Sequence, residues 1–252
     1  METSIQTVSF TMIAGAALHR GFYIIPLQPA SKVPMPGWGA TRGVRVLPDV
    51  PQDCNVGVCA APDLCILDVD SVNGLAMKAD PTPYLQTYAV ESSPGKRHFY
   101  LRPVGPVENL DLGPLGSLRA SNQYVVGAGS IHPKTGLPYK VVNAADVLEL
   151  HPGYYNELRK VAGNVKREQR RVFAQFEKGQ RQFGAGERHY FLREWAARNY
   201  FGDVDDLFER LWEINLKHCD PPKSEHQVQS LARWFEGRES APRLIRLKWR
   251  TQ

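Results

Sequence analysis

Two aspartates lie two positions apart at the end of an apolar run, in the segment LCILDVD at residues 64–70. The run predicts a buried strand, on which Asp68 and Asp70 would share one face. Neighbouring carboxylates at the end of a buried strand repel each other and lose solvation, and a divalent cation offsets both costs. Carboxylate oxygens favour Mg²⁺ or Mn²⁺, the ions that accompany nucleotide phosphates. The alternative interpretation is a strand that runs into an Asp-rich turn, since residues 70–74 are also good turn sequence.

A second segment, SSPGKRHFYLR at 92–102, places Lys96, Arg97 and His98 at the start of a predicted strand. Three potential hydrogen-bond donors in a row at the mouth of a strand could bind a triphosphate. The same residues are also compatible with an exposed basic turn whose histidine flanks the core.

A third segment, GSLRASNQYVVGAGSIHPKTGLPY at 116–139, has Arg119 just before a strand that ends in small residues. Backbone without bulky side chains can approach a ligand closely, and Ser130, His132 and Lys134 add polar groups there. The plain alternative is a β-hairpin with a polar loop.

Motifs of several other enzyme classes are absent, because the sequence contains no GxxxxGK[ST], GxSxG or HExxH. The segment FGAGERH at 183–189 has two glycines ahead of a predicted helix but lacks the Lys-Ser/Thr pair of a phosphate-binding loop. The four cysteines form no CxxC pair, which favours reduced thiols over a structural zinc site. These are Cys54, Cys59, Cys65 and Cys219.

The first 150 residues or so alternate short β-branched runs with Gly- and Pro-rich loops. One helix is expected at 10–20, and another between Val72 and Tyr88, where Pro81 and Pro83 weaken the pattern. Strands joined by loops with so few helices indicate an α+β domain with mixed or antiparallel sheets, and not a regular βαβ repeat. The predicted strands cover 22–27, 56–60, 64–70, 98–102, 123–129 and 139–143.

Helical patterns dominate the rest of the chain. Residues 154–176 predict one long basic helix, or a helix followed by a linker, and 187–200 predict a second helix. Asp203 is a candidate N-cap for a third helix, and Ser224 with Gln227 forms a capping box for a fourth. The short helices, each with an apolar stripe, indicate a small C-terminal bundle.

Charge separates the same two parts of the chain. Residues 1–150 contain 11 Lys/Arg and 12 Asp/Glu, whereas residues 151–252 contain 20 and 14. The basic excess suits a polyanionic partner, or simply a solvated helical surface. There is no run of about 18 apolar residues, so no membrane span is expected. The N-terminal apolar stretch lacks the preceding basic residues of a signal peptide and favours a helix.

Taken in order, these segments resemble the prim-pol branch of the archaeo-eukaryotic primase superfamily, which occurs in phage and plasmid replication proteins. The resemblance covers about residues 10–140. It is carried by RGFYIIPLQPASKVPMPGW (20–38), NVGVCA (55–60), LDVD (67–70), the segment ending in His98, QYVVGAGSIHP (123–133), Gly136 and Tyr139. Residues 184–235, with GER, N…CDPP and a closing helix, resemble the small helical domain that follows prim-pol domains.

The resemblance implies a role for each matching residue. Asp68 and Asp70 would bind the metal ions, Mg²⁺ or Mn²⁺. His98 would contact the phosphates of the incoming nucleotide, with Lys96 and Arg97 assisting. Arg119 and Ser130 match nucleotide-contacting positions, and Lys32 matches an early lysine of the family. The basic residues expected to bind DNA are Arg159, Lys160, Lys166, Arg167, Arg170 and Arg171.

One departure from the family pattern concerns the metal site. The family usually has an acidic residue two positions before the arginine of the third block, and Ser117 occupies that position here. A third carboxylate normally completes the metal site, so its absence implies an altered site, a weakened enzyme or a deliberate substitution. Asp111, six residues upstream, could substitute if the intervening loop bends.

The resemblance therefore implies a template-dependent DNA primase/polymerase that makes and extends primers by two-metal nucleotidyl transfer in a bacterial or archaeal cytoplasm. Its partners would be a single-stranded DNA template, NTP or dNTP, and a helicase domain or subunit. The expected division is a catalytic domain at 1–150, a basic helical linker at 151–180, a helical bundle at 181–240 and a basic tail at 241–252. Because of Ser117, a second interpretation stays open, in which the chain is a catalytically weakened replication module that binds nucleotide or DNA and works with a helicase. A phosphoesterase using the same carboxylates is a more distant alternative.

Overall fold

A computed structural model describes residues 9–177, 182–184, 187–200 and 202–236. The chain divides into two compact units, Met1–Val165 and Lys166–Gln252. None of the helices in the described ranges combines the length and apolar character needed to cross a membrane.

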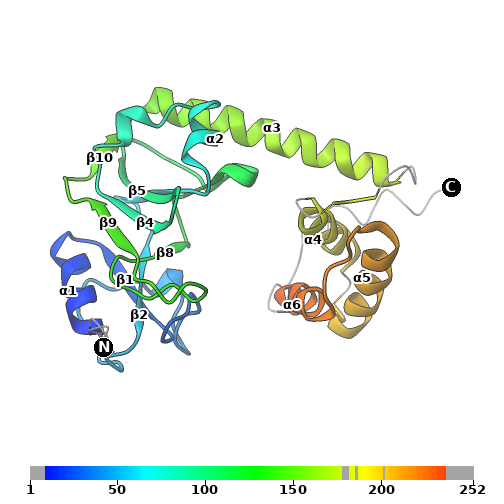
Figure 1. Cartoon of the computed structure of the whole chain (residues 1–252), viewed down its shortest axis with the longest axis horizontal. Helices are drawn as coiled ribbons and strands as arrows, with labels where there is room; N and C mark the ends of the chain where they lie inside the picture. The colour runs from blue at the N-terminus through cyan, green and yellow to red at the C-terminus, as the bar shows by residue number, and fades with distance from the viewer. Residues whose placement is uncertain (1–8, 178–181, 185–186, 201, 237–252) are drawn as a thin grey trace, which may run out of the picture. The chain divides into compact units, whose positions relative to one another are not determined.

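The first unit is built on two β-sheets (Figure 1). The smaller, three-stranded sheet has the order β1-β2-β8, and all of its pairs are antiparallel. The larger, seven-stranded sheet has the order β6-β7-β3-β5-β4-β9, with β10 paired in parallel to β5. The strands are β1 Tyr23–Leu27, β2 Asn55–Cys59, β3 Cys65–Val69, β4 Ala89–Ser93, β5 Lys96–Pro103, β6 Leu110–Asp111, β7 Gly116–Arg119, β8 Tyr124–Val126, β9 Lys140–Asn143 and β10 Leu148–Leu150.

Each face of the larger sheet is covered by a different layer. One face packs against α2 (Val72–Ala76) and the first half of α3 (Pro152–Glu177), through a core that includes Leu67, Leu75 and Leu158. The other face packs against the small sheet, through a core that includes Ile66, Tyr100 and Val58. Helix α1 (Phe10–His19) covers the far side of β1 and β2. Residues that alternate along β3 therefore enter two different cores, as the two-residue period of a strand requires.

Helices form the second unit. It contains the end of α3 with α4 (Arg188–Asn199), α5 (Val204–His218) and α6 (Glu225–Glu236) around one apolar core. Asp203 caps α5 as its sequence predicts, because its Oδ1 accepts from the backbone N–H groups of Asp205 and Asp206 at 2.9 and 3.0 Å. Asn215 is fully buried, and its side-chain amide bonds both the N–H and the carbonyl of Lys223.

The α+β fold class is confirmed, with antiparallel sheets followed by helices. The helix expected between Val72 and Tyr88 is much shorter than predicted. Only Val72–Ala76 is α-helical, followed by a 3-10 turn at Thr82–Tyr84. Pro81 and Pro83 explain the break, since proline removes a backbone donor and obstructs the preceding turn.

Candidate active site

A row of polar residues crosses the larger sheet on the face toward the small sheet. The strand register places His98 of β5, Asp68 of β3, Ser117 of β7 and Asp111 of β6 directly opposite one another in succession. Residues opposite each other on paired strands project from the same face. Residues 30 and 49 positions away in sequence, His98 and Ser117, are thereby brought opposite Asp68.

Gly116 allows β7 to lie close to β3 at this point. Its φ is +129°, and an added Cβ would lie 1.9 Å from the backbone oxygen of Asp68. No other residue fits such an approach, and only glycine adopts that φ without strain. The glycine fixes Ser117 opposite Asp68.

Arg119 binds the Asp68 carboxylate from the neighbouring strand. Its Nε and Nη2 both donate to Oδ2 of Asp68, at 3.1 and 2.6 Å, and its Nη1 donates to the carbonyl of Tyr124 at 3.0 Å. The Asp68 and Arg119 side chains are only 20% and 29% exposed. Partial burial makes this charge-assisted pair less screened than a surface ion pair.

Asp70 has a cation of its own, because Lys96 Nζ lies 2.7 Å from its Oδ1. Both side chains are about half exposed, so the pair is a weak, solvent-screened contact. Asp68 and Asp70 thus leave the end of β3 on one face, and each is neutralised by a side chain from an adjacent strand.

His98 is buried and lies against Asp68. Its Nε2 is 3.5 Å from Asp68 Oδ1, and its ring centroid is 5.9 Å from that of Tyr139. Burial lowers the pKa of His98 to about 4, with Arg119 and Lys32 adding to the effect and Asp68 opposing it. The imidazole is therefore neutral at pH 7. Its Nδ1 has no hydrogen-bond partner among the described residues.

Two predicted nucleotide-binding residues lie away from this cluster. Arg97 is opposite Val69 in the β3–β5 ladder, so it projects from the other face of the sheet than Lys96 and His98. Arg97 therefore does not share a face of the sheet with Lys96 and His98, and its contact with the nucleotide stays a prediction. Ser130 is fully buried, and its hydroxyl bonds the backbone N–H and carbonyl of Val56. Its contact is structural, between two segments of the small-sheet side.

Carboxylate oxygens on one face at a strand end suit a hard divalent cation, so Asp68 and Asp70 fit Mg²⁺ or Mn²⁺ as a pair. A third ligand is not assembled with them. Within the described ranges, no three His, Cys, Asp or Glu side chains gather closely enough to hold a metal ion. Asp111 is one strand further from Asp68 than Ser117, and its Oδ1 accepts from the N–H of Gly113. The bend that would let Asp111 replace the missing carboxylate is not present.

Two tyrosines complete the surroundings of the cluster, and sequence reasoning gave them no role there. Tyr124 holds Arg119 through its carbonyl, and its hydroxyl donates to the carbonyl of Lys32 at 2.7 Å. The Tyr139 hydroxyl is buried near Asp68, which raises the pKa of Tyr139 to about 12, mainly through burial. Their positions depend on contacts between the two sheets, for which a local pattern gives no signal.

The basic residues of the predicted linker lie on α3. The described side chains of Arg159, Lys160, Lys166 and Arg170 are exposed, and Arg171 pairs with Glu168. Arg167 is exposed as well. The helix thus presents cations to solvent along its length, on residues of both units.

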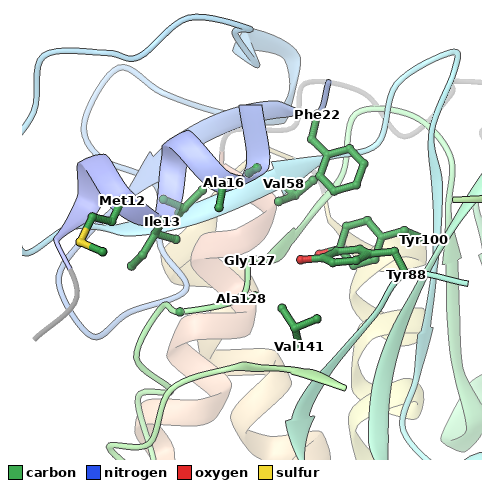
Figure 2. A pocket seen from close by; sticks show the side chains of 13 residues that line it. Met12, Ile13, Ala16, Phe22, Val58, Tyr88, Tyr100, Gly127, Ala128 and Val141 are labelled. Carbon is green, nitrogen blue, oxygen red and sulfur yellow. The ribbon is translucent and has the colours of Figure 1, made fainter. Parts of the chain in front are cut away.

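A separate cavity of about 250 Å³ lies next to α1, and it is largely apolar. Figure 2 shows Met12, Ile13 and Ala16 of α1 on one side and Tyr88, Tyr100 and Val141 on another. Asp68, Asp70, Lys96 and Arg119 are not among its lining residues. The chemistry-bearing cluster therefore lies apart from this cavity.

The family model for the N-terminal domain of bifunctional DNA primase/polymerase, Prim-Pol, matches residues 14–153. This is more than half of the chain, and it includes all four residues of the polar row, His98, Asp68, Ser117 and Asp111. The chain belongs to the Prim-Pol family.

Membership makes this Prim-Pol chain a DNA primase/polymerase-type replication protein that binds nucleotides and nucleic acid. Among solved structures, the chain is similar to one titled "Crystal structure of primase RepB'", with 12% identity and a TM-score of 0.33. That match covers 90% of this chain and 94% of the other. No curated protein matches this Prim-Pol sequence.

Proposed function

We propose that this Prim-Pol protein makes and extends primers by template-directed nucleotidyl transfer. The observation that carries the proposal is the placement of Asp68, Asp70, His98, Lys96 and Arg119 on one face at the end of β3, within the family match. Two carboxylates beside two cations and a neutral imidazole are the groups needed to bind a metal–triphosphate complex.

Asp68 and Asp70 would hold Mg²⁺ or Mn²⁺, which would offset the charge of the phosphates and lower the pKa of the attacking hydroxyl. Arg119 and Lys96 would bind the triphosphate oxygens and stabilise the charge that builds up as pyrophosphate leaves. His98, neutral at pH 7, lies against Asp68 and orients that carboxylate. Arg97 and Ser130 are left out of this nucleotide site because of where their side chains lie.

Exposed cations on α3 support a contact with the single-stranded template through its phosphates.

In this proposal residues 1–150 are the catalytic domain, 151–180 a basic linker and 181–240 a helical bundle that assists the start of synthesis, followed by a basic tail at 241–252. Removing residues 180–252 should then reduce de novo primer synthesis more than extension of a preformed primer. Equal loss of both activities would count against that role for the bundle. A helicase is the partner we propose for the complete replication reaction.

The decisive experiment measures primer synthesis on single-stranded DNA with Mn²⁺, for the full chain and for a variant with Asp68→Ala and Asp70→Ala. We expect synthesis and template-dependent release of pyrophosphate from the full chain and a loss of at least a hundredfold in the variant. Asp63→Ala is the matched control, since Asp63 pairs with Arg45 in another part of the same unit. Activity that survives the double substitution would remove the catalytic assignment.

Ser117 favours a second candidate, a replication module that binds nucleotide and DNA without catalysis. The missing third carboxylate is the observation behind it. Binding of a triphosphate and single-stranded DNA without any primer synthesis, in Mg²⁺ or Mn²⁺, would favour this module over the polymerase.

A further inference from the structure

The two carboxylates of the proposed metal site already have internal counter-ions. Arg119 donates twice to Asp68 Oδ2, and Lys96 Nζ lies 2.7 Å from Asp70 Oδ1. A divalent cation that binds these carboxylates must displace both contacts or leave two cations beside itself. Metal and side-chain cations therefore compete for the same oxygens.

The charges of the four side chains show why a metal ion competes poorly with Arg119 and Lys96 for the two carboxylates. Asp68 and Asp70 carry two negative charges, Arg119 and Lys96 carry two positive charges, and the four sum to zero. Ser117 is neutral where the family usually has a carboxylate. A free divalent ion therefore meets a site with no surplus of negative charge.

A nucleoside triphosphate changes this balance because every phosphate brings negative charge. Its oxygens are better partners for a guanidinium and an ammonium than one carboxylate each, since they offer several acceptors at once. Arg119 would keep its Nη1 bond to the Tyr124 carbonyl while its other nitrogens move from carboxylate to phosphate. The carboxylates are then open to the ions that the triphosphate carries.

We propose that Arg119 and Lys96 occupy the carboxylates of Asp68 and Asp70 and so prevent free metal ions from binding there. A nucleoside triphosphate that binds both side-chain cations then makes the carboxylates available to metal ions. This inference rests on the proposed function, because it assumes that the site binds a metal–nucleotide complex. The exposed Asp70–Lys96 pair is the weaker of the two and opens first. The partly buried Asp68–Arg119 pair sets the barrier to metal binding.

The test measures Mn²⁺ binding without nucleotide, by loss of the free-ion electron paramagnetic resonance signal, and binding of a non-hydrolysable Mg²⁺–triphosphate by calorimetry. We expect Arg119→Gln to bind Mn²⁺ alone about tenfold more tightly than the natural chain. The same substitution should weaken triphosphate binding by about tenfold or more. Opposite changes in the two affinities are the signature, because a merely structural role would weaken both.

Matched variants separate the effect of charge at the two ion pairs from other effects of substitution. Lys96→Gln changes a half-exposed residue at the first position of β5 and should shift both affinities in the same directions by a smaller factor. Arg119→Lys keeps the charge and should retain weak Mn²⁺ binding, whereas Arg45→Gln, in the distant pair with Asp63, should change neither affinity. Adding Asp68→Asn to Arg119→Gln should abolish the gained Mn²⁺ binding.

Two failures lead to different conclusions. If the natural chain binds triphosphate but both Gln variants leave Mn²⁺ affinity unchanged or lower, the counter-ion inference is overturned and the proposed function stands. If the natural chain binds no triphosphate at all, the proposed function falls, and the inference falls with it.

Discussion

Ser117 of β7 lies directly opposite Asp68 of β3 in the antiparallel ladder, with Gly116 drawing the two strands together. A hydroxyl therefore stands at the point from which a third carboxylate would reach the proposed metal ions. We therefore expect a single substitution at Ser117 to change how strongly the proposed site binds a metal ion.

Ser117→Asp should make the stability of the first unit depend on divalent ions. Opposed like charges on paired strands destabilise by about 0.2–1 kcal/mol, so the variant should unfold at a lower temperature than the natural chain in chelator. Mg²⁺ or Mn²⁺ should more than recover the loss, since a ligand that binds the folded state stabilises it. Calorimetric unfolding in chelator and in Mg²⁺ measures both effects. Ser117→Asn, which adds bulk without charge, is the control, and an equal response to Mg²⁺ in the two variants would contradict the prediction.

His98 should make the folded state less stable as the pH falls below neutral. Its pKa is lowered to about 4 by burial, whereas an unfolded histidine titrates near 6.5. Between these values the unfolded chain binds the extra proton, so stability is present above pH 6.5 and is lost progressively toward pH 4. The histidine contribution is on the order of 2–3 kcal/mol. Urea unfolding at several pH values should show a smaller loss in His98→Gln over this window. The same slope in both proteins would show that another group titrates there.

Tyr100→Phe should be neutral or slightly stabilising. The Tyr100 side chain is fully buried, and its hydroxyl has no hydrogen-bond partner in the described part of the chain. Removing an unpaired buried hydroxyl relieves its desolvation cost, which is worth up to about 1 kcal/mol here. The change in melting temperature measures this directly. A clear destabilisation would show that the hydroxyl is satisfied by ordered water.

Thr87→Val is the contrasting substitution in the same core. The Thr87 hydroxyl donates to the Tyr100 carbonyl at 2.6 Å and accepts from the Leu148 N–H at 2.9 Å, which ties β10 to the sheet. Valine keeps the shape and leaves both backbone groups without this partner, so we expect a loss of about 1–3 kcal/mol. Calorimetry of this variant beside Tyr100→Phe should give shifts of opposite sign or clearly different size.

Cations on α3 should contribute to binding of single-stranded DNA in a salt-dependent way. Replacing Lys160 and Lys166 by Gln removes two exposed positive charges. The slope of log affinity against log salt concentration should become shallower by about 1.4, for two lost phosphate contacts. Fluorescence anisotropy with labelled oligonucleotide measures this slope. Replacing Lys78 and Lys140 by Gln removes the same charge from other exposed positions and should leave the slope nearly unchanged; equal effects of both pairs would mean that only net charge matters.

The sequence by itself determined features that depend on neighbours along the chain. The spacing of Asp68 and Asp70 placed both carboxylates on one face because side chains alternate along a strand. Asp203 predicted the start of α5 because its side-chain oxygen accepts from the backbone N–H groups two and three residues on, those of Asp205 and Asp206. The order of the motifs indicated the family. The same alternation of side chains puts Arg97 on the opposite face of β5 from Lys96 and His98, because the strand begins at Lys96 and contains all three residues.

The tertiary structure decided which distant segments meet. Arg119 and Asp68 are 51 residues apart, and their contact exists because β7 pairs with β3 in one register. The sequence does not predict strands β4, β6, β7 and β10, because their segments contain few β-branched or aromatic residues. Ser130 was assigned to a nucleotide, yet it is buried against Val56 by the pairing of the small sheet. Such contacts follow from the closure of long loops and the packing of two sheets, and the local residue pattern does not encode either one.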